Sequence, residues 1–429
     1  MPQGRYTHAP VRALLYLPAV CLALATLNLN IGLLLALYAA RDVETFFYQP
    51  RVLAVTHTFT LGWISLAIIG VLYRFVPALT KHQIRWPWLA RLQVAMFLIG
   101  ASGLVSHFWI GHLNGMAWSA GVLLLSILLL LVCLLPSLLA APQYDATVIG
   151  IGVALLSFLG VATLGLLYAI DKVHPFLGGS VLSNIAAHAH LAVLGWVTLM
   201  ICAVSYRMVT AFVLPEQVLP EPARQQVLSL SALVPALVLA ILLRTWLVAP
   251  LALLTAGSLV WYASIIIRLL RTRRMAIDWS IRHVQAALVH LGAAAACGLA
   301  FVLGVDVGGR LGAHLAVAYG VLGLLGWVSN FILGMGTRLA PGLAAASGLT
   351  PRPLVSPRMQ AVMFSCFNLG VLGIAAGALA NAPRLLNSGI VLTLCATLLF
   401  ARALVGRVRR MLTAMRATGG RPRASPGSG

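Results

Sequence analysis

Long apolar stretches, each followed by a short polar or glycine- and proline-containing connection, succeed one another along almost the whole chain. A helix needs about 20 apolar residues to cross the hydrocarbon layer of a membrane. By that measure the pattern predicts an all-α polytopic membrane protein with twelve transmembrane helices. The predicted spans cover residues 12–40, 52–77, 88–111, 115–140, 147–170, 181–206, 226–245, 247–270, 282–305, 311–338, 359–381 and 386–406.

A short motif occurs three times at a nearly constant interval. Trp63, Trp196 and Trp327 each follow a glycine, and successive tryptophans are 133 and 131 residues apart. An arginine follows eleven residues after each tryptophan, at positions Arg74, Arg207 and Arg338. Because the interval corresponds to four spans, the motif predicts three pseudo-repeated four-helix arcs with the motif on the second helix of each. The arcs cover residues 12–140, 147–270 and 282–406.

Composition and charge place the chain in a lipid bilayer. Hydrophobic residues make up 61% of the sequence and charged residues 9%, which is typical of polytopic membrane proteins. If the N-terminus is inside, 23 lysines and arginines lie on the inner side and six on the outer side. This bias follows the positive-inside rule and predicts cytoplasmic termini in a bacterial inner membrane. The net charge of +21 is therefore explained without a nucleic-acid partner.

The C-terminal residues differ from the rest of the chain. We expect a transmembrane domain over residues 1–411 and a basic, disordered tail over 412–429, where arginines alternate with small and polar residues. The tail arginines are expected to lie near anionic lipid headgroups.

Four histidines are predicted to lie at one level of the membrane. His57 and His190 each precede the motif tryptophan by six residues, and Val321 takes that position in the third copy. His314 lies seven residues before Val321, about two helical turns away on nearly the same face. His188 precedes His190 by two residues. Because the three motif helices all run inward, these histidines share the outer third of the membrane.

Imidazole groups inside a bilayer usually face the bundle interior and have a function. Imidazole is also the common ligand of haem iron and of copper. We therefore predict a cofactor site at His57, His188, His190 and His314. Each histidine taken alone is explained equally well by packing and a hydrogen bond to a neighbouring polar group. His188 and His190 point about 200° apart around their helix. One of them is therefore the expected metal ligand, and the other serves a second cofactor or a hydrogen-bond network.

Other polar and aromatic residues carry weaker predictions. His82, His174 and His283 lie in connections or at span ends, where we expect them to be solvated. The motif arginines are expected to extend to the membrane interface and fix the depth of their helices. The motif tryptophans could pack on a planar macrocycle or fill the core between helices, and the sequence leaves both interpretations open.

The motif segments resemble a known family. Thr56-His57-Thr58-Phe59-Thr60-Leu61-Gly62-Trp63 and Ala187-His188-Ala189-His190-Leu191-Ala192-Val193-Leu194-Gly195-Trp196 are similar to a divergent, single-chain branch of the superfamily of haem–copper oxidase subunit I and the nitric-oxide reductase large subunit. The resemblance implies that His57 ligates a low-spin haem and that His190 or His188 ligates copper. It also implies that span 10 supplies a haem ligand, for which His314 is available. His57 and His190 are thus the implied metal ligands.

The resulting functional hypothesis is a haem-binding inner-membrane redox protein, with copper as a further candidate cofactor. It would act in electron transfer or in nitric-oxide or oxygen handling, with a cytochrome or a quinol as electron donor and respiratory-complex subunits as candidate partners. The family that the chain resembles carries a histidine pair on span 7, where this sequence has none. The copper-ligand set that the resemblance implies is therefore incomplete, and enzymatic activity stays open. The alternatives are a transporter or channel for a metal or small solute, and a non-catalytic assembly factor of a respiratory complex.

Overall fold

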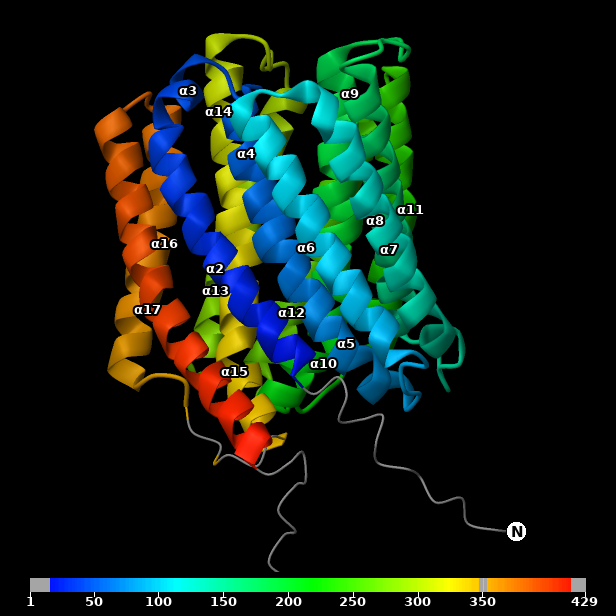
Figure 1. The fold of residues 1–429 in the computed structure, drawn as a ribbon, viewed down its shortest axis with the longest axis vertical. Helices are drawn as coiled ribbons and strands as arrows, with labels where there is room; N and C mark the ends of the chain where they lie inside the picture. Colours follow the sequence, from blue (N-terminus) through cyan, green and yellow to red (C-terminus); the bar gives the residue numbers. More distant parts are fainter. Residues whose placement is uncertain (1–15, 347–349, 351–352, 418–429) are drawn as a thin grey trace, which may run out of the picture.

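The computed structural model of the protein describes residues 16–346, 350 and 353–417 (Figure 1). Twelve helical segments in this part of the chain are long and apolar enough to cross a membrane, which confirms the predicted all-α polytopic fold. These segments are Leu17–Tyr38, Pro50–Thr80, Pro87–Ile110, Leu113–Leu139, Ala146–Asp171, Val181–Val213, Pro220–Leu243, Val248–Arg271, Trp279–Val302, Arg310–Leu339, Pro357–Leu379 and Pro383–Thr413.

Proline opens several of these helices. It stands at the first helical position of α6 (Pro87–Ile110), α11 (Pro220–Leu243), α16 (Pro357–Leu379) and α17 (Pro383–Ala417). Proline is suited to this position because its fixed φ is helical and the first amide needs no intrahelical partner. Helix α17 continues past the predicted start of the basic tail at residue 412, and the remainder of the tail, 418–429, lies outside the described residues.

Spans 2, 6 and 10 share an unusual local structure. Each consists of an α-helix, an eight-residue π-helix that begins five residues before the motif tryptophan, and a second α-helix. Figure 1 shows the first helices of the three spans toward one end of the bundle and the second helices toward the other. The segments are α4 (Pro50–His57), η1 (Thr58–Ser65) and α5 (Leu66–Thr80) in span 2; α9 (Val181–His190), η3 (Leu191–Thr198) and α10 (Leu199–Val213) in span 6; and α14 (Arg310–Val321), η4 (Leu322–Ser329) and α15 (Asn330–Ala346) in span 10.

The motif tryptophans lie in the core between these three spans. All three are at most 1% exposed, and each indole Nε1 donates a hydrogen bond to a hydroxyl on another motif helix. The pairs are Trp63 with Ser329 (2.8 Å), Trp196 with Ser65 (3.0 Å) and Trp327 with Thr198 (3.2 Å). Of the two interpretations of the tryptophans, the structure therefore supports packing between helices.

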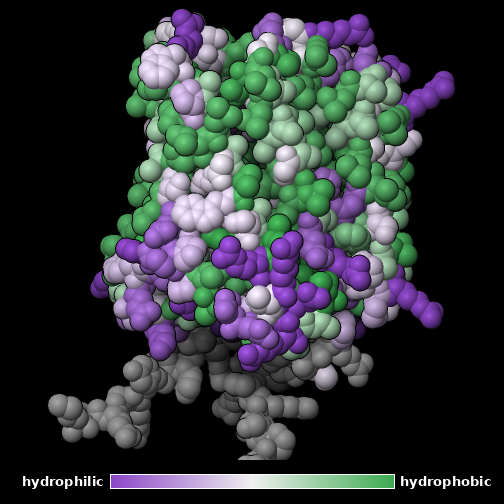
Figure 2. Space-filling model, turned by 180° about the vertical axis from the view of Figure 1, so that it is seen from behind, coloured by the Kyte–Doolittle hydropathy of each residue, from purple (hydrophilic) through white to green (hydrophobic). Residues whose placement is uncertain are grey.

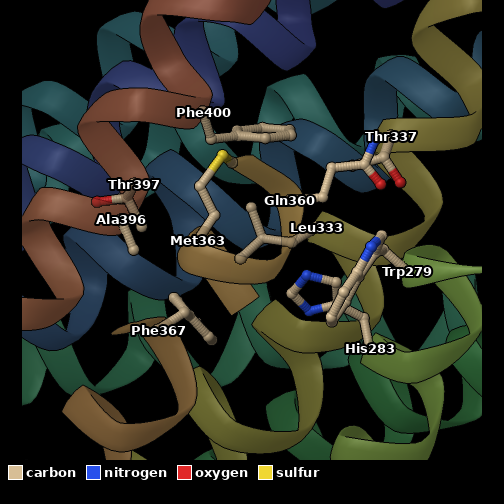
Figure 3. Close-up of a pocket in the computed structure, with 10 residues that line it drawn as sticks. All are labelled: Trp279, His283, Leu333, Thr337, Gln360, Met363, Phe367, Ala396, Thr397 and Phe400. Atoms are coloured by element: carbon tan, nitrogen blue, oxygen red, sulfur yellow. The ribbon is translucent and has the colours of Figure 1, made fainter. Parts of the chain in front are cut away.

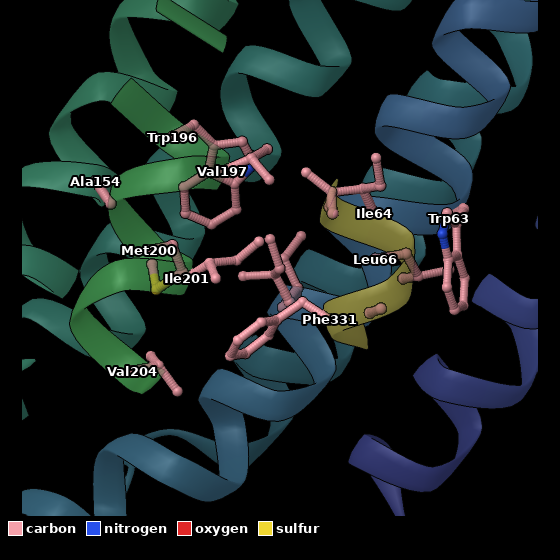
Figure 4. Packing of buried hydrophobic residues seen from close by; sticks show 14 of the residues in the cluster. Trp63, Ile64, Leu66, Ala154, Trp196, Val197, Met200, Ile201, Val204 and Phe331 are labelled. Atoms are coloured by element: carbon pink, nitrogen blue, oxygen red, sulfur yellow. The ribbon is translucent and has the colours of Figure 1, made fainter. Parts of the chain in front are cut away.

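Apolar side chains fill the space around this tryptophan layer. Phe158, on α8 (Ala146–Asp171), stacks on Trp196 with ring centroids 4.1 Å apart and planes 3° from parallel. Figure 4 shows Met200, Ile201 and Phe331 extending into the same core. On the outside, hydrophobic residues cover much of the face in Figure 2, and hydrophilic residues gather toward its ends. The exterior thus matches the requirements of a bilayer.

Two motif arginines form ion pairs. Arg207 contacts Asp145 at 2.7 Å, and Arg338 contacts Asp278 at 2.6 Å. Each aspartate also caps a helix: Asp145 accepts backbone amides at the start of α8, and Asp278 does so at the start of α13 (Trp279–Val302). These arginines therefore join neighbouring helix ends, in addition to the interfacial position expected from the sequence.

Candidate cofactor site

His57 and His190 have the same local geometry. Each is the last α-helical residue before the π-helix of its span. The Nδ1 atom of His57 donates to the carbonyl oxygen of Leu53 at 2.8 Å, and Nδ1 of His190 donates to that of Ala186 at 2.7 Å. Within the described residues, neither Nε2 atom forms a hydrogen bond. An imidazole held in this way presents an Nε2 lone pair, which is the usual arrangement of a metal-ligating histidine.

The two imidazoles lie deep in the bundle and yet keep accessible surface. Both side chains are surrounded by protein atoms, but both are half-buried rather than sealed. His57 stacks on Phe108 of α6 with ring centroids 5.0 Å apart, and the ring of His190 lies 6.2 Å from that of Tyr319 on α14. Both imidazoles therefore keep part of their surface accessible within spans that are otherwise largely enclosed by protein.

Packing differs between the two halves of the motif helices. From the π-helices toward the second helices, residues 62–70, 194–206 and 325–331 are buried without interruption. Toward the first helix of span 6, most residues of 182–193 are half-buried. The π-helices lie at this boundary, and such elements often occur at functional sites because they shift the positions of side chains on a helix. Both imidazoles lie at the end of the first helix of their span, on the less densely packed side of this boundary.

His188 faces a different neighbour from His190. Its ring meets that of Tyr168 on α8 edge-on, at 5.9 Å, whereas His190 faces α14. The Nδ1 atom of His188 and the phenolic oxygen of Tyr168 are buried, and neither has a hydrogen-bond partner in the described chain. Tyr168 was not singled out by the sequence, since nothing in its spacing relates it to the histidines.

His314 lies against span 11. It is buried, and its Nδ1 donates to the carbonyl oxygen of Ala378 on α16 at 2.9 Å. The structure therefore places His57 against α6, His188 against α8, His190 near span 10 and His314 against α16. Within the described residues, no group of three or more histidine, cysteine, aspartate or glutamate side chains is arranged to hold a metal ion. The assignment of these four histidines to a cofactor stays a prediction.

A second polar cluster lies around Asn330, at the start of α15. The expectation that His283 is solvated is wrong: it is 6% exposed, and its Nδ1 donates to Oδ1 of Asn330 at 2.8 Å. Nδ2 of Asn330 donates to Oδ1 of Asn368 at 2.9 Å, and Nε2 of His290 donates to the same oxygen at 3.1 Å. The cluster joins α13, α15 and α16. The sequence signal that was missed is the pair of mid-span asparagines.

A small cavity adjoins this cluster (Figure 3). It has a volume of about 20 Å³ and is bounded in part by Trp279, His283 and Gln360. That volume is sufficient for one water molecule. A second cavity, of about 70 Å³, has an apolar lining that includes Met200, Ile201 and Phe331. None of the four predicted cofactor histidines lines either cavity.

Comparison with known proteins identifies the fold. No family model and no curated protein matches the sequence. Among solved structures, a chain of a haem–copper terminal oxidase dimer, determined by cryo-electron microscopy, superimposes with a TM-score of 0.70 at 12% sequence identity. The match covers 96% of this chain and 85% of that chain. The predicted fold of haem–copper oxidase subunit I is therefore confirmed, and at this identity the likeness concerns the fold alone.

Proposed function

We propose that this multi-pass membrane protein binds haem and acts in electron transfer or in nitric-oxide or oxygen handling. The observation that carries the proposal is the matched geometry of His57 and His190. Both donate the Nδ1 proton to the carbonyl oxygen four residues earlier, have no Nε2 hydrogen-bond partner among the described residues, and are half-buried. His188 and His314 complete the set of candidate cofactor-binding residues.

The geometry of His57 and His190 suits residues that would hold haem iron, for two reasons. The bond from Nδ1 to a backbone carbonyl fixes the tautomer and the ring orientation and makes Nε2 a better ligand. The apolar surroundings, including Phe108 beside His57, fit a flat hydrophobic macrocycle. A bound haem would supply a redox-active iron whose potential depends on the axial ligand and the polarity of the pocket. The chain itself would orient the imidazoles and exclude water.

The residues fit copper less well than haem. A copper centre of the oxidase type needs several imidazoles directed at one point. His190 and His188 face different helices, and the described residues offer no group of three suitable ligands. We therefore propose haem iron as the metal that this chain holds, and we assign no role to copper.

Transport is the less favoured alternative. A channel along the axis between spans 2, 6 and 10 would have to pass the level of Trp63, Trp196 and Trp327, where buried side chains pack against one another. We further propose a bacterial inner membrane with cytoplasmic termini, on the basis of the basic residues that gather at the inner ends.

Visible absorption spectroscopy with metal analysis tests the proposal. We expect the purified protein to show a Soret band and to contain iron. His57→Leu and His190→Leu should alter the spectrum, whereas His82→Leu, at an exposed loop position, should not. A protein with no Soret band and no iron would rule the proposal out. Solute uptake by cofactor-free proteoliposomes would favour the transporter alternative instead.

A further inference from the structure

The connection between α6 and α7 (Met116–Leu139) places two histidines beside each other. The rings of His107, in the last turn of α6, and His112, in the connection, have their centroids 5.9 Å apart and their planes tilted by 37°. The chain turns at Gly111, which has a φ of +70°, and the amide of His112 donates to the carbonyl oxygen of His107 at 3.0 Å. This helix-ending turn brings the second imidazole back toward the first.

The imidazole of His107 is held in a fixed orientation. Its Nδ1 donates to the carbonyl oxygen of Gly103 at 2.6 Å, and Nε2 has no hydrogen-bond partner among the described residues. The ring lies against Gly115, where an added Cβ atom would clash with Nε2. Any other residue at position 115 would therefore force the ring to move. A bond from Nδ1 to a carbonyl, with Nε2 left over, is the usual arrangement of a metal-ligating histidine.

His112 adds a second nitrogen ligand. Its side chain is exposed, and no hydrogen bond within the described chain holds the ring. Imidazole nitrogens bind Zn²⁺ at about 2.0–2.1 Å, which sets the centroids of two rings on one tetrahedral ion roughly 5 Å apart. The rings of His107 and His112 are about 1 Å further apart than this. Because exposed side chains change rotamer within nanoseconds, rotation of His112 closes the difference.

The two ligands select a class of ion. Imidazole is a favoured ligand of Zn²⁺, Ni²⁺ and other late transition metals, whereas Mg²⁺ and Ca²⁺ prefer oxygen ligands such as carboxylates. Helices α6 and α7 and the connection between them contain no aspartate or glutamate. The pair therefore suits a late transition metal and does not suit Mg²⁺ or Ca²⁺.

The histidine pair is separate from the candidate cofactor site. His107 faces α7, where the Ser119 hydroxyl lies 3.5 Å from its Nδ1. The next residue, Phe108, points to a different side of α6 and stacks on His57 of α4. Figure 1 shows the connection at the end of the bundle where α4 and α9 begin. With the membrane orientation proposed above, the two histidines are open to the outside of the cell.

We propose that His107 and His112 bind one divalent late transition metal ion, such as Zn²⁺, at the connection between α6 and α7. Two protein nitrogens hold the ion and water completes its coordination sphere, so the ion exchanges with the medium. The inference goes beyond the proposed function, because the site needs neither haem nor the histidines of the candidate cofactor site.

Titration of the full-length protein with zinc chloride tests the site. The protein is purified in detergent through a tag that contains no histidine, stripped of metal with a chelator and titrated by isothermal calorimetry. We expect saturable binding that weakens roughly tenfold or more in His112→Ala, because this change removes one ligand at an exposed position and leaves the fold intact. Gly115→Ala keeps both imidazoles but displaces the ring of His107, and should also weaken binding roughly tenfold.

Two control variants separate this site from other histidines. His174→Ala removes another exposed histidine, and the double variant His57→Leu/His190→Leu removes the proposed iron ligands. Both should bind Zn²⁺ as the unaltered protein does, and magnesium chloride should give no binding.

Four results would overturn the site. They are no saturable Zn²⁺ binding by the unaltered protein, unchanged affinity in His112→Ala, an equal loss of affinity in His174→Ala, and loss of binding in the double variant. An equal loss in His174→Ala would mark adventitious binding to surface imidazoles, and loss in the double variant would assign the ion to the candidate cofactor site. The readout is Zn²⁺ binding by the haem-free protein, so a failure of haem binding leaves this test unaffected.

Discussion

The indole Nε1 of Trp196 donates a 3.0 Å hydrogen bond to the hydroxyl of Ser65 in the preceding copy of the motif. Ser65 lies two residues after Trp63. Thr198 and Ser329 have the same position after Trp196 and Trp327, and their hydroxyls accept hydrogen bonds from the indoles of Trp327 and Trp63. The three bonds form a closed cycle in which each of spans 2, 6 and 10 is joined to both others. This cycle fixes the relative depth of the three helices and therefore the level of His57 and His190 above it.

Ser65→Ala leaves the indole of Trp196 buried without an acceptor. We expect the free energy of unfolding to fall by about 1–2 kcal/mol. A buried donor left without an acceptor raises the loss, whereas the low average strength of hydrogen bonds in membrane proteins, below about 1 kcal/mol, limits it. Thermal unfolding in detergent measures this. Ser264→Ala is the control, because Ser264 is exposed and bonds to a carbonyl of its own helix. Equal unfolding temperatures for the two variants would contradict the structural role of the cycle.

Gly326 precedes Trp327 and lets α13 approach closely. A Cβ atom here would lie 2.7 Å from Cγ of the buried His290, which is itself held by Asn368. Gly326→Ala should therefore cost about 1–3 kcal/mol through overpacking. Gly257 has nothing within 4 Å of an added Cβ, so Gly257→Ala should leave stability unchanged or slightly raised. If both variants unfold at the same temperature, the helices do not approach as closely as described.

Asn368 accepts hydrogen bonds from both His290 and Asn330. Asn368→Leu would remove both acceptor contacts and leave buried donors on two other helices. We expect a loss of about 2–4 kcal/mol, counting roughly 1–2 kcal/mol for each unpaired donor. Asn184→Leu, at a half-buried position near the outer end of α9, is a suitable comparison. The same thermal unfolding assay applies, and a loss no larger than that of Asn184→Leu would contradict a stabilising network.

Much of the fold could be predicted from the sequence because bilayer thickness sets the length of each apolar stretch. The triple Gly-Trp motif also indicated which helices are related. The hydroxyl partners were visible as Ser65, Thr198 and Ser329, each two residues after a tryptophan, but spacing along one helix does not reveal bonds between helices. His283 was misjudged because it lies one residue after the predicted start of span 9, whereas the helix begins at Trp279 and buries it.

The candidate site was predicted less completely than the fold. Spacing correctly indicated that His188 and His190 face different directions, because the helical period fixes the angle between them. It could not indicate which helices they face. The contact between His188 and Tyr168 depends on how α8 packs on α9, and the position of His314 against Ala378 depends on span 11. Contacts of this kind arise only from the packed bundle.

Titration of the haem-depleted protein with haemin tests the central claim most directly. Haem bound per chain is measured from the Soret band for the unaltered protein, for His82→Leu and for the double variant His57→Leu/His190→Leu. Our account predicts saturable binding in the first two and loss of the Soret signal in the double variant, because Nε2 of each of these imidazoles is a proposed iron ligand. An equal haem content in all three proteins, or none in the unaltered protein, would contradict it.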